Sequence, residues 1–99
     1  MSLTGVIPPV VTPLTASGDF DYESFARNAN RMIDAGVHGL FAMGSSGEVA
    51  FSTSERRDEV TSAAIEVAAG RVPVVVGVID MQTTRVIEHA RLRGWSACR

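Results

Sequence analysis

The sequence contains no lysine. All nine of its basic residues are arginines, within 99 residues that carry a formal net charge of −2. Schiff-base chemistry needs an amine nucleophile, so these residues cannot supply it except through the N-terminal amine. The single cysteine, Cys98, cannot form an internal disulfide, and the cysteine content therefore does not point to secretion.

Long apolar runs and basic stripes are also missing. The longest apolar run, residues 72–79, is far shorter than the ~20 residues that a membrane-spanning helix needs. The first residues lack the basic segment and apolar core of a signal peptide, and the slightly acidic charge balance disfavours nucleic acid. The two histidines and Cys98 are too scattered for a metal site. We expect a cytoplasmic protein with no cofactor, no metal, and no membrane or nucleic-acid partner.

The apolar residues that are present alternate between strand-like and helix-like patterns. Strands are predicted over residues 6–12, 39–43 and 72–79, the first of them irregular or at an edge because Pro8 and Pro9 lack N–H donors. The second strand begins 33 residues before the third, counting from residue 39 to residue 72, as in a βαβ unit. This rhythm predicts an α/β fold with a parallel sheet.

Three helices are predicted between and after these strands. Asp21 is a suitable N-cap for the first helix, which should end at Gly36. A capping box at Ser52-x-x-Glu55 predicts the start of the second helix, and Thr83 or Thr84 should cap the third.

Several polar side chains are expected to have ordinary structural roles. Arg56 and Arg57 should lie on a solvated helix face with local ion pairs. His89 should face solvent, whereas His38 and Tyr22 should have packing, loop or surface roles.

The stretch Gly44-Ser45-Ser46-Gly47-Glu48 is the sharpest candidate site. In parallel α/β folds ligands bind at the carboxyl ends of the strands, and this stretch follows the second predicted strand. Its glycines allow a tight turn, and its hydroxyls and N–H groups suit a carboxylate or phosphate. A polar connection without a ligand is the alternative interpretation.

Three stretches together carry a resemblance to a known family: "GVIPPVVTPL", "DYESFARNANRMIDAGVHGLFAMGSSGE" and "SERRDEV". In order and spacing they resemble the opening third of the dihydrodipicolinate synthase / N-acetylneuraminate lyase family, whose members are class I pyruvate-dependent aldolases. The resemblance runs from about Gly5 to Ala90 and implies the first three βα units of a TIM (β/α)8 barrel, truncated. We assign residues 1–91 to this partial barrel.

The resemblance also implies roles for individual residues. Ser46 and the Gly47 N–H match the groups that hold the carboxylate of pyruvate, and Ser45 matches a hydroxyl of a proton relay. Thr12 should lie near the pocket, and Glu48 should anchor its loop rather than act as an acid. Homo-oligomerisation is implied for the parent family.

Parts of the family pattern are absent or altered. The family's Schiff-base lysine lies on a later strand that these residues do not include, so the chain should be inactive alone. Residues 92–99, "LRGWSACR", depart from the family and form an anomalous tail, for which we expect a frameshift near Leu92 or a truncation. The competing interpretations are a free-standing α/β module that binds a small anion at Gly44–Glu48, and an assembly of several copies.

Overall fold

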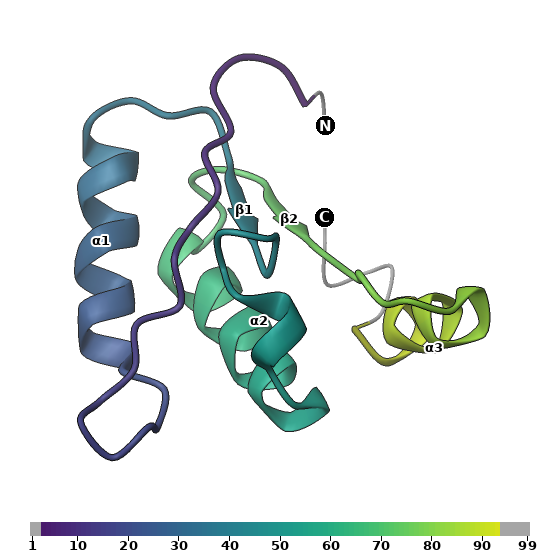
Figure 1. The fold of residues 1–99 in the computed structure, drawn as a ribbon. Coiled ribbons are helices and arrows are strands. Elements are labelled where there is room, and N and C mark those ends of the chain that lie inside the picture. The colour runs from purple at the N-terminus through teal and green to yellow at the C-terminus, as the bar shows by residue number, and fades with distance from the viewer. Residues whose placement is uncertain (1–2, 94–99) are drawn as a thin grey trace.

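The computed structural model describes residues 3–93. The elements are α1 (Tyr22–Asp34), β1 (Leu40–Ala42), the 3₁₀ helix η1 (Val49–Phe51), α2 (Ser54–Ala68), β2 (Val74–Val76) and α3 (Thr83–Arg93). Helices α1 and α2 lie beside a short parallel sheet, and α3 lies farther from it, beyond the end of β2 (Figure 1). Strands β1 and β2 pair in parallel, with Leu40 opposite Val74 and Ala42 opposite Val76. The predicted α/β class and parallel pairing are confirmed, although both strands are shorter than predicted.

The N-terminal segment runs beside β1 without forming a regular strand. One parallel bridge joins Pro9 to Phe41, and the Val10 N–H donates to the Phe41 carbonyl at 2.8 Å. His38 supports the start of this segment, because its Nδ1 accepts the Val6 N–H at 2.9 Å. The strand predicted over residues 6–12 is therefore present only as an isolated bridge, in keeping with the irregularity that its two prolines predicted. His38 is an exposed loop residue, one of the roles expected of it.

Helix α1 begins and ends as its sequence predicts. Asp21 is the N-cap, and its carboxylate accepts the Ser24 N–H at 3.1 Å and the Ser24 hydroxyl at 2.7 Å. Beyond the helix, Gly36 adopts φ +100°, a left-handed conformation that glycine accepts most readily. Tyr22 is 40% exposed at the surface. Partial burial, together with a hydrogen bond to Glu66 of α2, raises the pKa of its phenol.

The predicted starts of α2 and α3 are each wrong by one or two residues. Thr53 caps α2, with its hydroxyl accepting the Arg56 N–H at 3.1 Å, whereas Ser52 ends η1 and donates its hydroxyl to the Glu48 carbonyl. Ser52 already serves as the C-cap of the short η1, so the N-cap of α2 falls one residue later, at Thr53. Helix α3 begins at Thr83 itself, so neither Thr83 nor Thr84 precedes it as a cap. The predicted tail begins at Leu92 inside α3, and residues 94–99 of it lie outside the described residues.

The core lies between the sheet and helices α1 and α2. Phe25 and Ala29 of α1, Leu40 of β1 and Ala64 of α2 are all fully buried there, and α2 contacts both strands. Helix α3 packs against α2 beyond the carboxyl end of β2 (Figure 1). The opposite face of the sheet carries no helix within residues 3–93, which leaves that face open.

Candidate functional site

The Gly44–Glu48 loop follows directly from the carboxyl end of β1, where the sequence placed it. Met43 connects the strand to the loop and is fully buried with φ +55°. A left-handed, buried, non-glycine residue is an uncommon and strained feature that concentrates at functional sites. The side chains of Ser45 and Ser46 are exposed at the tip of the loop.

The two glycines of the loop are needed for close packing rather than for positive φ. A Cβ atom on Gly44 would lie 3.0 Å from Phe41 Cζ, and one on Gly47 would lie 3.1 Å from the Met43 nitrogen and 3.2 Å from the Val10 carbonyl oxygen. The left-handed positions are instead Met43 and Glu48, the latter with φ +59°. Both glycines therefore bring the loop down onto the strand ends.

Hydrogen bonds inside the loop hold it as two successive turns. The Gly47 N–H donates to the Gly44 carbonyl at 3.1 Å, and the Glu48 N–H donates to the Ser45 carbonyl at 3.0 Å. By the resemblance, the Gly47 N–H should bind the carboxylate of pyruvate. In the structure this N–H already donates to the Gly44 carbonyl. Among residues 3–93 the N–H groups of Ser45 and Ser46 have no acceptor, so these N–H groups and the hydroxyls of the two exposed serines are the donors left for a ligand.

Thr12 supports this loop from the N-terminal segment. Its side chain is buried, with 7% exposure, and its hydroxyl donates to the Gly47 carbonyl at 2.6 Å. The structure thus places Thr12 beside the candidate loop, where its hydroxyl contacts the loop backbone. Glu48 contributes its carbonyl, which accepts from Ser52 and from the Phe51 N–H, while its side chain is exposed.

The loop after β2 approaches the same strand end. The Gly77 N–H donates to the Ala42 carbonyl at 2.9 Å, and a Cβ on Gly77 would overlap the Met43 carbonyl oxygen. Only glycine fits this contact. The carboxyl ends of β1 and β2 are therefore packed directly against each other beneath the loop.

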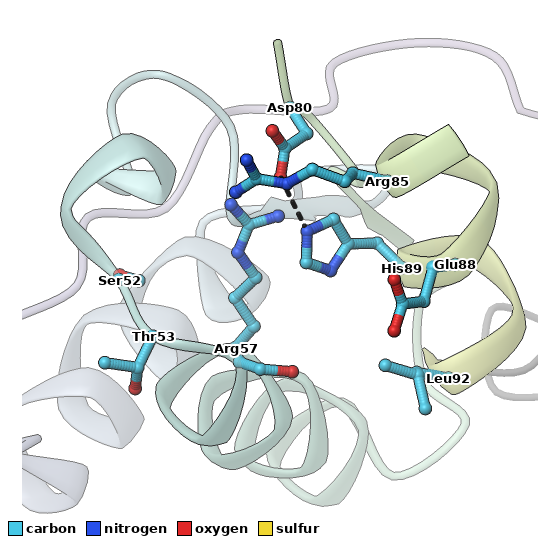
Figure 2. Close-up of a pocket in the computed structure, with 9 residues that line it drawn as sticks. Ser52, Thr53, Arg57, Asp80, Arg85, Glu88, His89 and Leu92 are labelled. Carbon is cyan, nitrogen blue, oxygen red and sulfur yellow. Dashed lines mark hydrogen bonds and ion pairs between the residues drawn. The ribbon is translucent and has the colours of Figure 1, made fainter. Parts of the chain in front are cut away.

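A second polar cluster, which the sequence analysis did not predict, surrounds Asp80 (Figure 2). The Asp80 carboxylate has 6% exposure and lies 2.9 Å from His89 Nε2 and 3.2 Å from Arg85 Nε. It also accepts the Met81 N–H at 2.6 Å. The hydrogen bond from His89, then that from Met81 and the charge of Arg85, lower the pKa of Asp80 below its usual value.

Arg57 belongs to this cluster. The prediction that it lies on a solvated helix face is therefore wrong. Its side chain is buried, and its guanidinium donates to the Ile79 carbonyl at 2.9 Å and to the Val49 carbonyl at 3.3 Å. Arg57 therefore joins the segment after the Gly44–Glu48 loop to the segment after β2. Arg56 matches the prediction better, since it forms a 3.8 Å pair with Glu59.

His89 also departs from its prediction, because its side chain is 13% exposed and points toward Asp80 instead of solvent. The helical spacing of the sequence could have predicted that both Arg57 and His89 lie on the packed sides of their helices. Arg57 precedes the buried Val60 and Ala64 by three and seven positions, and His89 follows Val86 by three, so each lies on the packed side of its helix.

The second cluster borders a cavity of about 280 Å³ between α2 and α3. The cavity is lined by Ser52, Thr53, Ser54, Arg57, Asp80, Arg85, Glu88, His89 and Leu92. None of the candidate loop residues lines it, so the loop and this cavity are separate features. Within residues 3–93 no group of three or more histidine, cysteine, aspartate and glutamate side chains is placed to hold a metal, and none of the helices there could span a membrane.

The fold and the site define a class: a parallel α/β fold with a polar loop at the carboxyl end of a strand. The model of the dihydrodipicolinate synthetase family matches residues 2–95, and the chain belongs to that family. It is 40% identical over 90 residues to an uncharacterized DapA-like lyase of Halobacterium salinarum. It is also 40% identical over 96 residues to 4-hydroxy-tetrahydrodipicolinate synthase of Phenylobacterium zucineum.

Solved structures agree with this assignment. YagE, a prophage protein of the dihydrodipicolinic acid synthase family from E. coli K12, was solved in complex with pyruvate. It is 37% identical and superposes with a TM-score of 0.88, covering 96% of this chain and 32% of that one. The two relatives are covered to 30% and 32% of their lengths, by 91% and 94% of this chain. The chain therefore spans about a third of the length of the proteins that it matches.

Proposed function

We propose that the Gly44–Glu48 loop binds the carboxylate of pyruvate or a similar 2-oxo acid. The observation that carries this proposal is the pair of exposed serines, Ser45 and Ser46, at the carboxyl end of a parallel strand, whose N–H groups have no acceptor within residues 3–93. Backbone N–H groups and hydroxyls together form a favourable site for a small anion. The pyruvate complex of YagE supports this choice of ligand.

Within this site each residue has a distinct proposed role. The Ser46 hydroxyl binds the carboxylate, and Ser45 passes a proton during Schiff-base formation. Thr12 holds the loop at its buried side through the Gly47 carbonyl. For the Gly47 N–H to bind the carboxylate as well, its present 3.1 Å bond to the Gly44 carbonyl would have to open. We therefore propose the N–H groups of Ser45 and Ser46 as the backbone donors.

The reaction itself needs an amine that these residues do not contain. Aldolase or lyase chemistry of the family type begins when an amine condenses with the ketone of pyruvate and water leaves. Because the 99 residues include no lysine, we propose that they form the carboxylate-binding part of a lyase site and are inactive alone. The partial barrel over residues 1–91, with residues 92–99 as its anomalous tail, and the cytoplasmic location remain predictions.

Amide NMR of the full chain tests the binding proposal. Pyruvate should shift the Ser45 and Ser46 N–H resonances with a saturable dependence on its concentration. Ser46→Ala should weaken binding by about tenfold, which is the loss of one hydrogen bond to a charged group. The matched control is Ser62→Ala, at an exposed position of α2, which should change nothing.

Two results would overturn the proposal. One is the absence of any shift at the loop up to high pyruvate concentrations. The other is stronger binding of inorganic phosphate than of pyruvate, which would favour an anion module of another kind. Borohydride treatment with pyruvate adds a check on chemistry: only the N-terminal amine should become labelled, and a label elsewhere would contradict the inactivity of the chain alone.

A further inference from the structure

The N–H groups of Ser45 and Ser46 are oriented by the carbonyls that share their peptide bonds. In a planar trans peptide the C=O and the N–H point in opposite directions. The carbonyls of Gly44 and Ser45 accept N–H groups from residues 47–49, at distances of 3.0 to 3.4 Å. Both carbonyls are therefore turned toward the segment that follows them, and the two serine N–H groups are turned away from it.

Val49 completes this set of hydrogen bonds, and Arg57 holds it against α2. Val49 is buried, with 3% exposure, and Arg57 has 6% exposure near the start of α2. The Val49 carbonyl accepts the Ser52 N–H at 3.2 Å within the turn of η1, and it also accepts from Arg57 Nη2 at 3.3 Å. The guanidinium thus joins the downstream end of the loop to another helix.

The same guanidinium holds the segment that follows β2. Its Nη1 donates to the Ile79 carbonyl at 2.9 Å, and the side chain runs from α2 toward this segment (Figure 2). Two residues earlier, Gly77 packs against the carbonyl of Met43, the left-handed residue that leads into the loop. The loop is therefore held at its entry through Gly77 and at its exit through Val49, and the rigid fork of Arg57 joins both sides.

We infer that Arg57 is a positioning residue of the carboxylate-binding loop. By holding the carbonyls of Val49 and Ile79 together, it keeps the N–H groups of the two loop serines in the orientation that receives a 2-oxo acid. Donors that are already ordered bind more tightly, because the ligand does not have to order them. Arg57 acts through the loop backbone and is not a catalytic residue. This inference rests on the proposed function of the loop.

Pyruvate titrations of the full chain, followed at the folded-state amide resonances, test this role. Arg57→Met removes both donors and should raise the dissociation constant about fivefold to tenfold, because pyruvate must then order the loop. Val67→Ala is the matched control: Val67 is buried on the same helix, and its truncation destabilises the core. The control should leave the dissociation constant of the folded protein within about twofold. Equal weakening in both variants would contradict the inference, because a general loss of stability would explain it.

Arg57→Lys keeps the positive charge but replaces the planar fork with a single nitrogen. We expect it to be more stable than Arg57→Met and to bind pyruvate about twofold to fivefold more weakly than the wild type. It also decides the question where Arg57→Met fails to fold. Borohydride treatment must label this variant at the N-terminal amine alone, so that binding is not covalent. Full wild-type affinity would contradict the inference, because charge alone would then suffice.

Amide hydrogen exchange in the free chain separates this inference from the proposed function. Arg57→Met should speed exchange of the Gly47 and Glu48 N–H groups relative to that of the buried residues of α1, and Val67→Ala should not. The absence of pyruvate shifts in the wild type would refute carboxylate binding, while exchange would still decide whether Arg57 holds the loop. Wild-type affinity and wild-type loop exchange in Arg57→Met would refute the positioning role alone.

Discussion

The hydroxyl of Thr12 donates a 2.6 Å hydrogen bond to the carbonyl of Gly47, across 35 positions of sequence. This bond ties the N-terminal segment to the loop that carries both serines. Thr12 is buried, so neither partner can readily exchange the bond for water. The candidate site therefore depends on a segment that is joined to β1 by an isolated bridge between Pro9 and Phe41.

Thr12→Val should destabilise the chain and loosen the loop. The substitution keeps the shape of the side chain but leaves a buried carbonyl without its donor, which costs about 1–2 kcal/mol. The free energy of unfolding from urea titration measures this loss. Thr12→Ser restores the hydroxyl and should recover most of it, whereas Thr84→Val, at an exposed position of α3, should have no effect. Equal losses in Thr12→Val and Thr12→Ser would show that packing, not the hydrogen bond, is responsible.

Gly77→Ala should be strongly destabilising. Its new Cβ would overlap the Met43 carbonyl oxygen, and because that atom belongs to buried backbone, the two strand ends must separate at a cost of about 1–3 kcal/mol. Gly18→Ala is the control for backbone strain: Gly18 has φ +88° and open space around it, so we expect a smaller loss of about 1 kcal/mol. Thermal unfolding followed by circular dichroism compares the two variants. A milder effect at Gly77 than at Gly18 would contradict the close contact.

Local signals in the sequence predicted the fold better than they predicted the polar contacts. Asp21 and Gly36 could be identified because an N-cap and a left-handed terminus depend on neighbours within four residues. The interaction of Arg57 with Ile79 spans 22 positions, and the pattern Arg56-Arg57-Asp58-Glu59 suggested nearby ion pairs instead. Charge spacing alone could not indicate that one arginine turns toward the sheet.

The candidate loop shows a similar limit. Its position at the end of β1 followed from the apolar run before it, and the structure confirms that position. The sequence also predicted that its glycines would allow a tight turn. The left-handed residues are nevertheless Met43 and Glu48. Glycine is required at both loop positions because of close contacts with Phe41, Val10 and Met43, which only the folded chain brings together.

Arg57→Met should lower stability and release the segment after β2. The buried Val49 carbonyl and the part-buried Ile79 carbonyl lose a charged donor, which costs about 2–3 kcal/mol. Arg31→Met, at an exposed position of α1, is the control and should change stability by less than about 0.5 kcal/mol. Hydrogen exchange should show faster opening around residues 77–81 in Arg57→Met alone. Unchanged exchange there would mean that Arg57 does not join the two segments.

The stability of the chain should fall with acid in a way that depends on Asp80. The hydrogen bond from His89 leads the groups that lower the pKa of this carboxyl below its usual value of 3.8. A lowered pKa in the folded state means that the unfolded chain binds the proton more tightly. The stabilising effect is therefore complete well above pH 3.8 and is lost as the pH falls through the lower, folded-state pKa.

Asp80→Asn should reduce stability at pH 7 and flatten this acid dependence. Asp34→Asn, at the exposed end of α1, should leave the acid dependence unchanged. Urea titrations between pH 2.5 and pH 7 on all three proteins make the comparison, and parallel curves for the wild type and Asp80→Asn would refute the role of Asp80.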